Sequence, residues 1–298
     1  MHAVFEEVLG SLSRKGDPAA ATDEELKRAV DEKIEDFRRA ILGESEDVRT
    51  LHLLRRAGAT AYLLLAGMRD EFKNSRFRPA FFELPFGMPQ KDGRLSLPAM
   101  EFWKDENLRA ALRGIADRVD LYKDGDTVYF RIVDYKTGNK EFDPSELQYG
   151  LSSQMLLYMR AVCTTKDPAF LAAIGADENT NLVPAGIVYC IAKRPRLTVR
   201  PGMTENEILS AAKNEITRNG IAIDEPHLLS ALDTSPDQSY LPTGKGKRMA
   251  REEFEAMLES LPKTLGEVTK KLHGGNADIT PLCEGKQDAC RYCDFRAV

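Results

Sequence analysis

The sequence predicts an α/β fold in which helices flank a small mixed β-sheet and a helical segment precedes that sheet. Three observations lead to this prediction. Residues 1–70 carry apolar side chains at helical spacing, residues 114–138 alternate apolar and polar residues on both sides of a short turn, and residues 182–192 are almost continuously apolar. Alternation is typical of a half-buried strand, whereas a continuous apolar run suits a central strand that is covered on both faces.

The composition excludes several classes of protein. Hydrophobic residues make up 42% of the 298 residues and charged residues 30%, as in an ordinary soluble globular protein. The sequence has no run of about 18 or more apolar residues, so it predicts no membrane span, and its start lacks the pattern of a signal peptide. The net charge of −5 argues against indiscriminate DNA binding but allows a local basic channel. We therefore expect a cytoplasmic protein.

The first 70 residues predict three helices. In the first helix, His2 and Glu6 are four residues apart and therefore lie on one side. A capping box with the sequence TDEE predicts a second helix over about residues 23–42. A third helix is expected over about residues 46–74, with an apolar stripe that faces the core.

Caps, turns and apolar runs predict the remaining elements. They are a strand over residues 81–86, loop and short strand over 87–107, a hairpin over 114–138, a helix over about 147–162, loops over 168–181 and 194–203, a strand over 182–192, a helix over about 204–219, a loop over 233–249 and a final helix over about 250–272.

The hairpin is the central feature of the sequence: GIADRVDLYKDGDTVYFRIVDYKTG. A two-residue loop at the Asp-Gly step (residues 124–125) would pair Asp117 with Ile132. This register puts Asp117 diagonal to Asp134 on the same side of the sheet, roughly 7–8 Å away between backbones. Lys136 shares the face of Asp134 because the two residues are two positions apart. Two carboxylates and one amine therefore lie on faces that are otherwise apolar.

These polar residues need partners, because burying an unpaired carboxylate is costly. Lys136 supplies one positive charge against two carboxylates, and a divalent ion such as Mg²⁺, which prefers oxygen ligands, would fill the deficit. Metal-bound water beside a lysine is a competent nucleophile for a phosphodiester. The alternative is a buried Asp–Lys ion pair without a metal, and the residue types alone do not decide between the two.

Four motifs, taken in order, resemble the PD-(D/E)xK nuclease superfamily. GIAD (114–117) and VDYK (133–136) resemble its G-x-x-D … D-x-K core, and QMLLY (154–158) resembles the Q-x-x-x-Y helix of the RecB-like branch. The N-terminal MHAVFEEVLG resembles the histidine-bearing helix of that branch. The RVD continuation (118–120) and the C-terminal cysteines are similar to the nuclease domains of AddB-type subunits of helicase–nucleases. The resemblance implies a restriction-endonuclease-like core.

The resemblance also implies a role for each matching residue. Asp117 and Asp134 would bind Mg²⁺ or Mn²⁺ together with His2, and Lys136 would position or activate the attacking water. Gln154 would hold the scissile phosphate or that water, although the residue type alone equally allows a core glutamine bonded to the backbone. Candidates of lower rank are Glu83, which is otherwise a solvent-facing acid, Tyr158 and Asp120.

The C-terminal tail holds three of the five cysteines. Cys290 and Cys293 have the spacing of a Zn or Fe–S clamp, and Cys283 lies near enough to be a third thiolate. In AddB-type nucleases such a pair contributes to a [4Fe–4S] cluster that also uses one cysteine before the core and one after the pair. This chain has neither, so we expect the cluster in a longer parent protein and not in this chain alone. A zinc site that adds His273 and a set of free thiols are the alternatives.

The sequence as a whole predicts a metal-dependent deoxyribonuclease. By resemblance, it would act as an exonuclease on single-stranded or duplex DNA ends in double-strand-break processing and recombination, with a helicase–nuclease partner subunit. The rival interpretations are a non-catalytic DNA-binding or scaffold module of the same fold, a free-standing exonuclease of the CRISPR-associated kind, and a binding protein with an ordinary Asp–Lys ion pair.

The expected domain organisation is a single nuclease domain over residues 1–298. It divides into a helical N-terminal part (1–75), a catalytic core of sheet and helix (80–192), a region of loops and helices (193–272) and a cysteine-containing tail (273–298).

Overall fold

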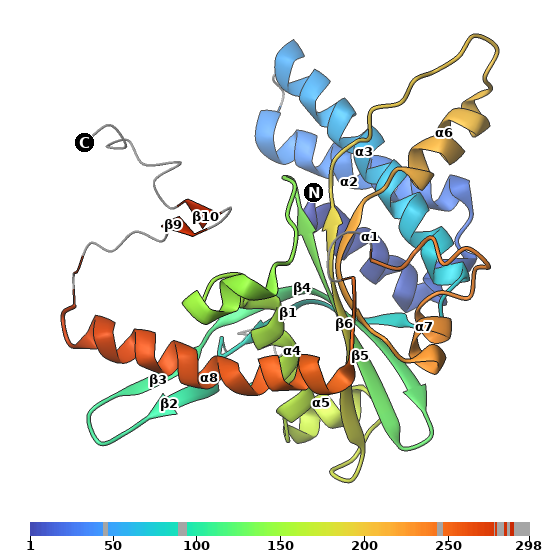
Figure 1. Cartoon of the computed structure of the whole chain (residues 1–298). Helices are drawn as coiled ribbons and strands as arrows, with labels where there is room; N and C mark the ends of the chain where they lie inside the picture. The colour runs from blue at the N-terminus through green and yellow to red at the C-terminus, as the bar shows by residue number, and fades with distance from the viewer. Residues whose placement is uncertain are drawn as a thin grey trace.

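The computed structural model is a mixed α/β structure in which helices cover both faces of a six-stranded sheet (Figure 1). It describes residues 1–43, 47–88, 94–242, 247–276 and 278, together with the backbone of residues 283–284 and 287–288. Within these residues, no helix has both the length and the apolar character needed to cross a membrane.

The N-terminal helices form where their caps and apolar spacing predict them. Helix α1 spans His2–Lys15, α2 spans Asp23–Leu42 and α3 spans Val48–Lys73. Thr22 caps α2 through reciprocal hydrogen bonds: the Glu25 N–H donates to Thr22 Oγ1 (3.2 Å) and the Thr22 N–H donates to Glu25 Oε2 (2.9 Å). The predicted second helix is confirmed at both ends, and α3 begins two residues later than expected.

The central sheet has the strand order β1-β4-β5-β6-β7-β8. The β5–β6 and β7–β8 pairs are parallel and the other pairs are antiparallel, so the sheet is mixed, as predicted. Its strands are β1 (Arg78–Phe86), β4 (Gly114–Asp124), β5 (Thr127–Lys136), β6 (Asn181–Ile191), β7 (Arg218–Ile223) and β8 (Arg248–Met249), while β2 (Met100–Lys104) and β3 (Arg109–Leu112) form a separate hairpin and β9 (Cys283–Glu284) and β10 (Gln287–Asp288) another pair.

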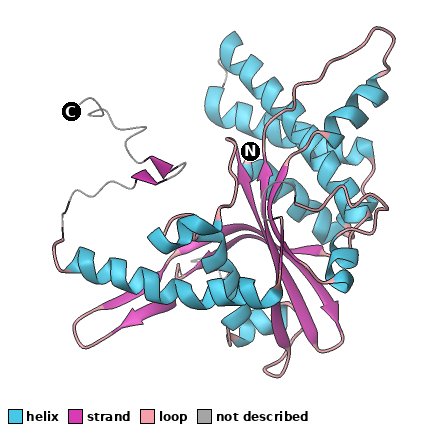
Figure 2. Ribbon diagram, in the orientation of Figure 1, coloured by secondary structure: helices cyan, strands magenta, loops and turns pink. Residues whose placement is uncertain are grey.

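Helices pack on both faces of the sheet (Figure 2), and each face has its own apolar cluster of buried side chains. On one face, α1, α2 and α3 pack against Val133 and Tyr135 of β5. On the other face, α4 (Gln154–Thr164) and α8 (Arg251–His273) belong to the cluster that includes Ile132. The strand β5 alternates between the two layers because successive side chains point to opposite faces. The shorter helices are α5 (Pro168–Ala173), α6 (Glu205–Asn214) and α7 (Pro226–Leu232).

The helix expected over residues 147–162 is divided in the structure. A 3₁₀ turn spans Pro144–Tyr149, and α4 begins only at Gln154. Gly150 ends the turn in the left-handed region (φ 74°), and Ser152 also has a positive φ of 52°. An α-helix cannot continue through such dihedrals, so the predicted single helix is wrong in its first half.

The helix expected over residues 204–219 ends at Asn214, and β7 follows it. The sequence concealed this strand because its first two residues are polar. In the structure both are buried with partners: Arg218 pairs with Glu71, and Asn219 donates to a backbone carbonyl at 2.7 Å. The β2–β3 hairpin and α5 likewise lie in segments that were expected to be mainly loop.

The turn of the central hairpin lies one residue later than predicted. Gly125 and Asp126 form the two-residue loop, and Asp124 pairs with Thr127. Gly125 has a φ of 57°, a left-handed value that glycine adopts at little cost at the first loop position of a hairpin turn. The position of this glycine therefore sets the register of the whole hairpin.

The later turn changes the neighbours of the two acids. Ile132 does not pair with Asp117, as predicted, and the last recorded pair of the ladder is Arg118 with Val133. Continuing this register places Asp117 directly across from Asp134 instead of diagonal to it. The predicted diagonal was wrong, but the two residues remain neighbours on adjacent strands.

A buried ion network joins α3 to the sheet. Glu71 of α3 pairs with Arg131 of β5 (2.8 Å) and with Arg218 of β7 (2.9 Å). Asp120 of β4 pairs with Arg131 (2.7 Å) and with Arg118 (2.8 Å). All five side chains are at most 6% exposed. Burial opposes ionisation, but the charges of Arg131 and Arg218 lower the pKa of Glu71 to about 2.

Replacement of Glu71 tests this network. Glu71→Gln should lower the free energy of unfolding by about 3–5 kcal/mol, because it removes the buried carboxylate that pairs with Arg131 and Arg218. Urea denaturation measures the change. The control Glu35→Gln removes an exposed carboxylate that pairs with Arg38 and Arg39 on α2, and it should leave the unfolding midpoint within error.

The wild type and Glu71→Gln should also differ in how their free energy of unfolding depends on pH. Folding lowers the pKa of Glu71 from 4.5 to about 2, so its contribution to stability is complete above a pH of about 4.5 and is lost as the pH falls toward 2. The stability difference between the wild type and Glu71→Gln should therefore shrink on acidification. A difference that stays constant over this range would contradict the proposed ionised network.

Candidate metal centre

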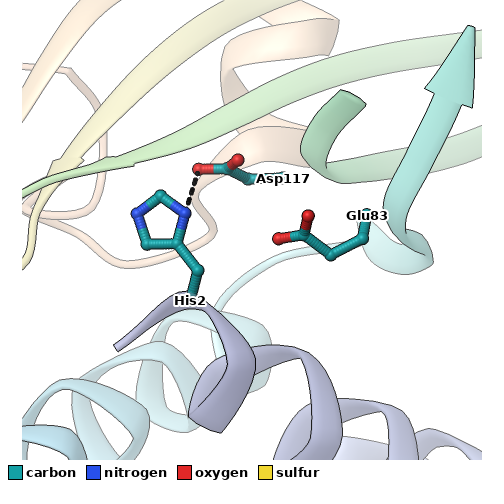
Figure 3. A group of neighbouring side chains, drawn as sticks. All are labelled: His2, Glu83 and Asp117. Carbon is teal, nitrogen blue, oxygen red and sulfur yellow. Dashed lines mark ion pairs between the residues drawn. The ribbon is translucent and has the colours of Figure 1, made fainter. Parts of the chain in front are cut away.

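Three side chains from three elements meet where the N-terminus of α1 approaches the sheet (Figure 3). His2 begins α1, Glu83 belongs to the edge strand β1, and Asp117 belongs to β4. Within the described residues, one ligand atom from each side chain lies within 4.8 Å of the other two. We call His2, Glu83 and Asp117 the metal centre.

The peptide groups of Tyr135 hold two members of the metal centre. The Tyr135 N–H donates to Asp117 Oδ2 (2.8 Å), and the Tyr135 carbonyl oxygen lies 2.8 Å from His2 Nε2. A carbonyl oxygen can only accept a hydrogen bond, so His2 Nε2 carries the proton. In the neutral imidazole the lone pair is then on Nδ1, which lies 3.4 Å from Asp117 Oδ2. This arrangement leaves a metal-ligating nitrogen directed at a carboxylate.

Glu83 has an unusual backbone conformation at the metal centre. Its φ is 48°, a left-handed value that is uncommon for a residue other than glycine. Its neighbours Phe82 and Leu84 pack into the two different apolar clusters, so the strand changes orientation at this residue. Burial raises the pKa of Glu83, and the nearby charges of Asp117 and Glu6 raise it further. Strained backbone is typical of functional sites. A bound cation would neutralise the like charges that meet here.

Asp134 and Lys136 lie beside the metal centre on β5. Lys136 Nζ is 2.5 Å from Asp134 Oδ2, and the Asp134 side chain is only 5% exposed. Burial raises the pKa of Asp134, and the charge of Asp117 raises it further. Asp134 is thus within electrostatic reach of Asp117, although it is not a member of the three-residue group. The predicted ligand set had Asp134 as the third ligand, where the structure groups Glu83 with His2 and Asp117.

Gln154 and Tyr158 lie on α4, on the far side of β4 from α1. Gln154 Nε2 donates to Tyr158 Oη (3.1 Å), and the Tyr158 ring stacks on Phe86 at 5.1 Å between centroids. A Cβ added at Gly114 would lie 2.5 Å from Tyr158 Oη, so the glycine of the G-x-x-D motif makes room for this tyrosine. The pair is therefore anchored three residues before Asp117 along β4.

The other predicted site residues are placed elsewhere or lie outside the described structure. Asp120 belongs to the buried ion network. His273 is the exposed last residue of α8. The side chains of Cys283, Cys290 and Cys293 lie outside the described residues, so the predicted Zn or Fe–S site stays a prediction.

The donor groups fit a hard divalent ion. Among the described residues, the carboxylates of Glu83 and Asp117 lie beside the His2 ring nitrogens, and the neighbouring Asp134 carboxylate pairs with Lys136. Oxygen-rich sites with octahedral preference suit Mg²⁺ and Mn²⁺, and an imidazole ligand adds affinity for Mn²⁺. The excess negative charge of this donor set is the charge that a divalent cation would neutralise.

Comparisons with known proteins give matches over the whole chain. The family model described as "PD-(D/E)XK nuclease superfamily" matches residues 1–298. The chain is 26% identical over 315 residues to an ATP-dependent helicase/deoxyribonuclease subunit from Clostridium kluyveri, and 27% and 28% identical to the proteins of the same name from Thermoanaerobacter sp. and Acetivibrio thermocellus. Each match covers 100% of this chain but 26% of the relative, so the chain spans about a quarter of the length of these curated relatives.

Replacement of Glu83 tests the metal centre directly. Glu83→Gln removes one of several crowded negative charges, so the unfolding midpoint of the metal-free protein should stay equal or rise. Mn²⁺ binding should weaken by at least about tenfold, as is typical when a metal site loses a supporting carboxylate. Thermal unfolding with and without Mn²⁺ and isothermal titration measure the two effects.

Glu7→Gln is the matched control for this variant. Glu7 is also near the start of α1, but its carboxylate pairs with Lys33 of α2. Mn²⁺ binding should be unchanged in this control. Equal Mn²⁺ affinity in Glu83→Gln and Glu7→Gln would exclude Glu83 from the metal centre.

Proposed function

The chain belongs to the PD-(D/E)XK nuclease superfamily, and we propose that it hydrolyses DNA phosphodiester bonds with a divalent ion, Mg²⁺ or Mn²⁺, held at the metal centre. The observation that carries this proposal is the convergence of His2, Glu83 and Asp117 beside the Asp134-x-Lys136 strand. An imidazole lone pair, crowded carboxylates and one lysine are the groups that metal-assisted phosphodiester hydrolysis requires.

The residues of the site would have different roles in holding the ion. His2 and Asp117 would be primary ligands because the Tyr135 peptide already fixes their orientation. Glu83 and Asp134 would complete the ligand set. When bound, the ion would polarise the scissile phosphate and lower the pKa of a water ligand.

We expect Lys136 to contact the reacting atoms, because its side chain is not buried in the core. Its side chain is 33% exposed while its partner Asp134 is 5% exposed, so the ammonium bridges a buried acid and the solvent side of the site. From there it can orient the attacking water and stabilise the negative charge that develops on the phosphate. Gln154 is held by Tyr158 at the start of α4 on the other face of the sheet, and its proposed contact with the phosphate or water rests on the family resemblance alone.

The names of the relatives support a biological setting for this proposal, because they are subunits of an ATP-dependent helicase/deoxyribonuclease. We infer that this chain is the nuclease part of such a helicase–nuclease. It would act as an exonuclease on DNA ends during double-strand-break processing and recombination in the cytoplasm, and it would work with a helicase–nuclease partner subunit.

Two substitutions test catalysis. Asp117→Asn retains an oxygen that accepts the Tyr135 N–H, so the fold should be preserved while the ligand charge is lost. Lys136→Ala removes the ammonium. Each variant should degrade linear DNA in Mg²⁺ at least about 100-fold more slowly than the wild type, which is the usual cost of losing one group that stabilises transition-state charge.

Lys123→Ala is the control, because Lys123 lies toward the far end of β4 and donates to the Gly175 carbonyl (2.8 Å). Its rate should equal that of the wild type. Degradation by Asp117→Asn and Lys136→Ala at the wild-type rate, with unchanged circular dichroism, would rule out the proposed centre. A wild-type chain that binds DNA but cleaves none in Mg²⁺ or Mn²⁺ would favour the non-catalytic module.

A further inference from the structure

A groove of about 490 Å³ lies beside the metal centre. Helix α1 forms one wall and strand β1 the other, and Glu83 lines both the groove and the metal centre. A volume of this size suits a few nucleotide units or a drug-sized ligand, not a duplex. The groove therefore adjoins the proposed reaction site at Glu83 and is otherwise lined by residues outside that site.

The side chains along the α1 wall of the groove change from acidic to basic. Glu6, Gly10 and Arg14 line the groove, and they follow His2 of the metal centre along α1 at steps of four residues. The 1.5 Å rise per residue separates His2 from Arg14 by roughly 18 Å. Moving outward from the metal centre, the helix thus offers an imidazole, a carboxylate, a bare backbone position and a guanidinium group.

Gly10 leaves space between the acidic and basic parts of this wall. A Cβ placed there would lie 3.5 Å from Arg14 Nη1 and 3.8 Å from Phe82 Cδ2, which are ordinary contact distances. A long side chain at this position would extend into the groove. The Arg14 guanidinium and the Phe82 ring therefore both lie next to this bare position.

Arg94 adds a second guanidinium group to the groove. Its side chain is 67% exposed, and its Nη1 lies 4.0 Å from Glu6 Oε1. Leu95 and Ile115 line the groove as well, and Ile115 is 40% exposed although it is a large apolar residue. The groove therefore combines two arginines with accessible apolar surface.

This combination of arginines and apolar surface suits a single nucleic-acid strand better than a duplex or an acidic peptide. Arginine contacts phosphate through its planar fork of donors, and unpaired bases and sugars pack against apolar side chains. A duplex keeps its bases stacked inside and would leave the apolar surface uncovered. An acidic peptide would be repelled at the Glu6–Glu83 end, where a nucleic-acid strand would meet the metal ion.

We propose that this groove binds the DNA strand on one side of the scissile phosphate as a single strand, with Arg94 and Arg14 contacting phosphates at increasing distance from the metal centre. Arg94 and Arg14 are then positioning residues, because they hold the strand and do not touch the reacting atoms. At the ~3.4 Å rise of a stacked strand, Arg14 would be about five nucleotides from the cleaved bond. This inference rests on the proposed nuclease function and names its substrate-binding surface.

Strand binding without cleavage tests the proposal. A fluorescent oligo-deoxythymidine strand is titrated with the chain in Ca²⁺, and a gel confirms that the strand stays intact. Arg14→Gln and Arg94→Gln should each weaken binding several-fold and reduce the slope of log affinity against log salt by about 0.7, the value expected for one lost phosphate contact on a single strand. In Mg²⁺, both variants should raise KM for the strand with little change in kcat.

Arg109→Gln is the matched control. Arg109 lies on the separate β2–β3 hairpin, its side chain is 72% exposed, and it pairs with Glu101 much as Arg94 approaches Glu6. This variant should bind with the affinity and salt slope of the wild type. A duplex of equal length should lose less affinity than the single strand in Arg14→Gln and Arg94→Gln.

Several results would overturn the groove assignment. They are unchanged affinity and slope in both groove variants, an equal loss in Arg109→Gln, an equal loss of duplex affinity, or a fall in kcat with constant KM. Any of these in a chain that still cleaves DNA would leave the nuclease function intact and reject only the groove. A wild-type chain that cleaves nothing in Mg²⁺ or Mn²⁺ would instead reject the function itself.

Discussion

The structure depends on how Tyr135 is held between the N-terminal helices and the sheet. Its hydroxyl accepts a hydrogen bond from Arg118 Nη1 (3.0 Å), and its ring packs against Phe5 of α1 at 4.7 Å between centroids. Its peptide groups bind Asp117 and His2. One residue therefore connects the buried ion network, the packing of the first helix and the orientation of two metal ligands. A shift of α1 relative to the sheet would disturb all three together.

Charge is distributed unequally on the two sides of this connection. Between α3 and the sheet, three guanidinium groups face two carboxylates, which leaves one excess positive charge. The metal centre together with Asp134 and Lys136 carries three carboxylates and one ammonium, which leaves two excess negative charges. A divalent ion matches that second excess. The paired network is closed and buried, so it stabilises one arrangement of the layers, whereas the acidic side stays open to an ion and to the groove arginines.

Patterns in the sequence predicted the elements that carry the site but not the contacts between these elements. Alternation and the Asp-Gly step predicted the hairpin, and the apolar run predicted β6. The register was wrong because the sequence does not reveal which residue takes the left-handed φ, and that residue is Gly125 at the first loop position. Glu83 ranked low for a related reason: strict alternation cannot predict a strand that turns over at a residue with a φ of 48°.

The sequence by itself determined the α/β class, the capped helices and the grouping of Asp117, Asp134 and Lys136 on adjacent strands, because local spacing and turn chemistry encode these features. Tertiary structure alone decided that Glu83 joins His2 and Asp117, and that Arg14 and Arg94, eighty residues apart, line one groove. These contacts form only after α1 docks on the sheet. Docking depends on the packing of buried side chains distant in sequence, which periodicity along the chain does not record.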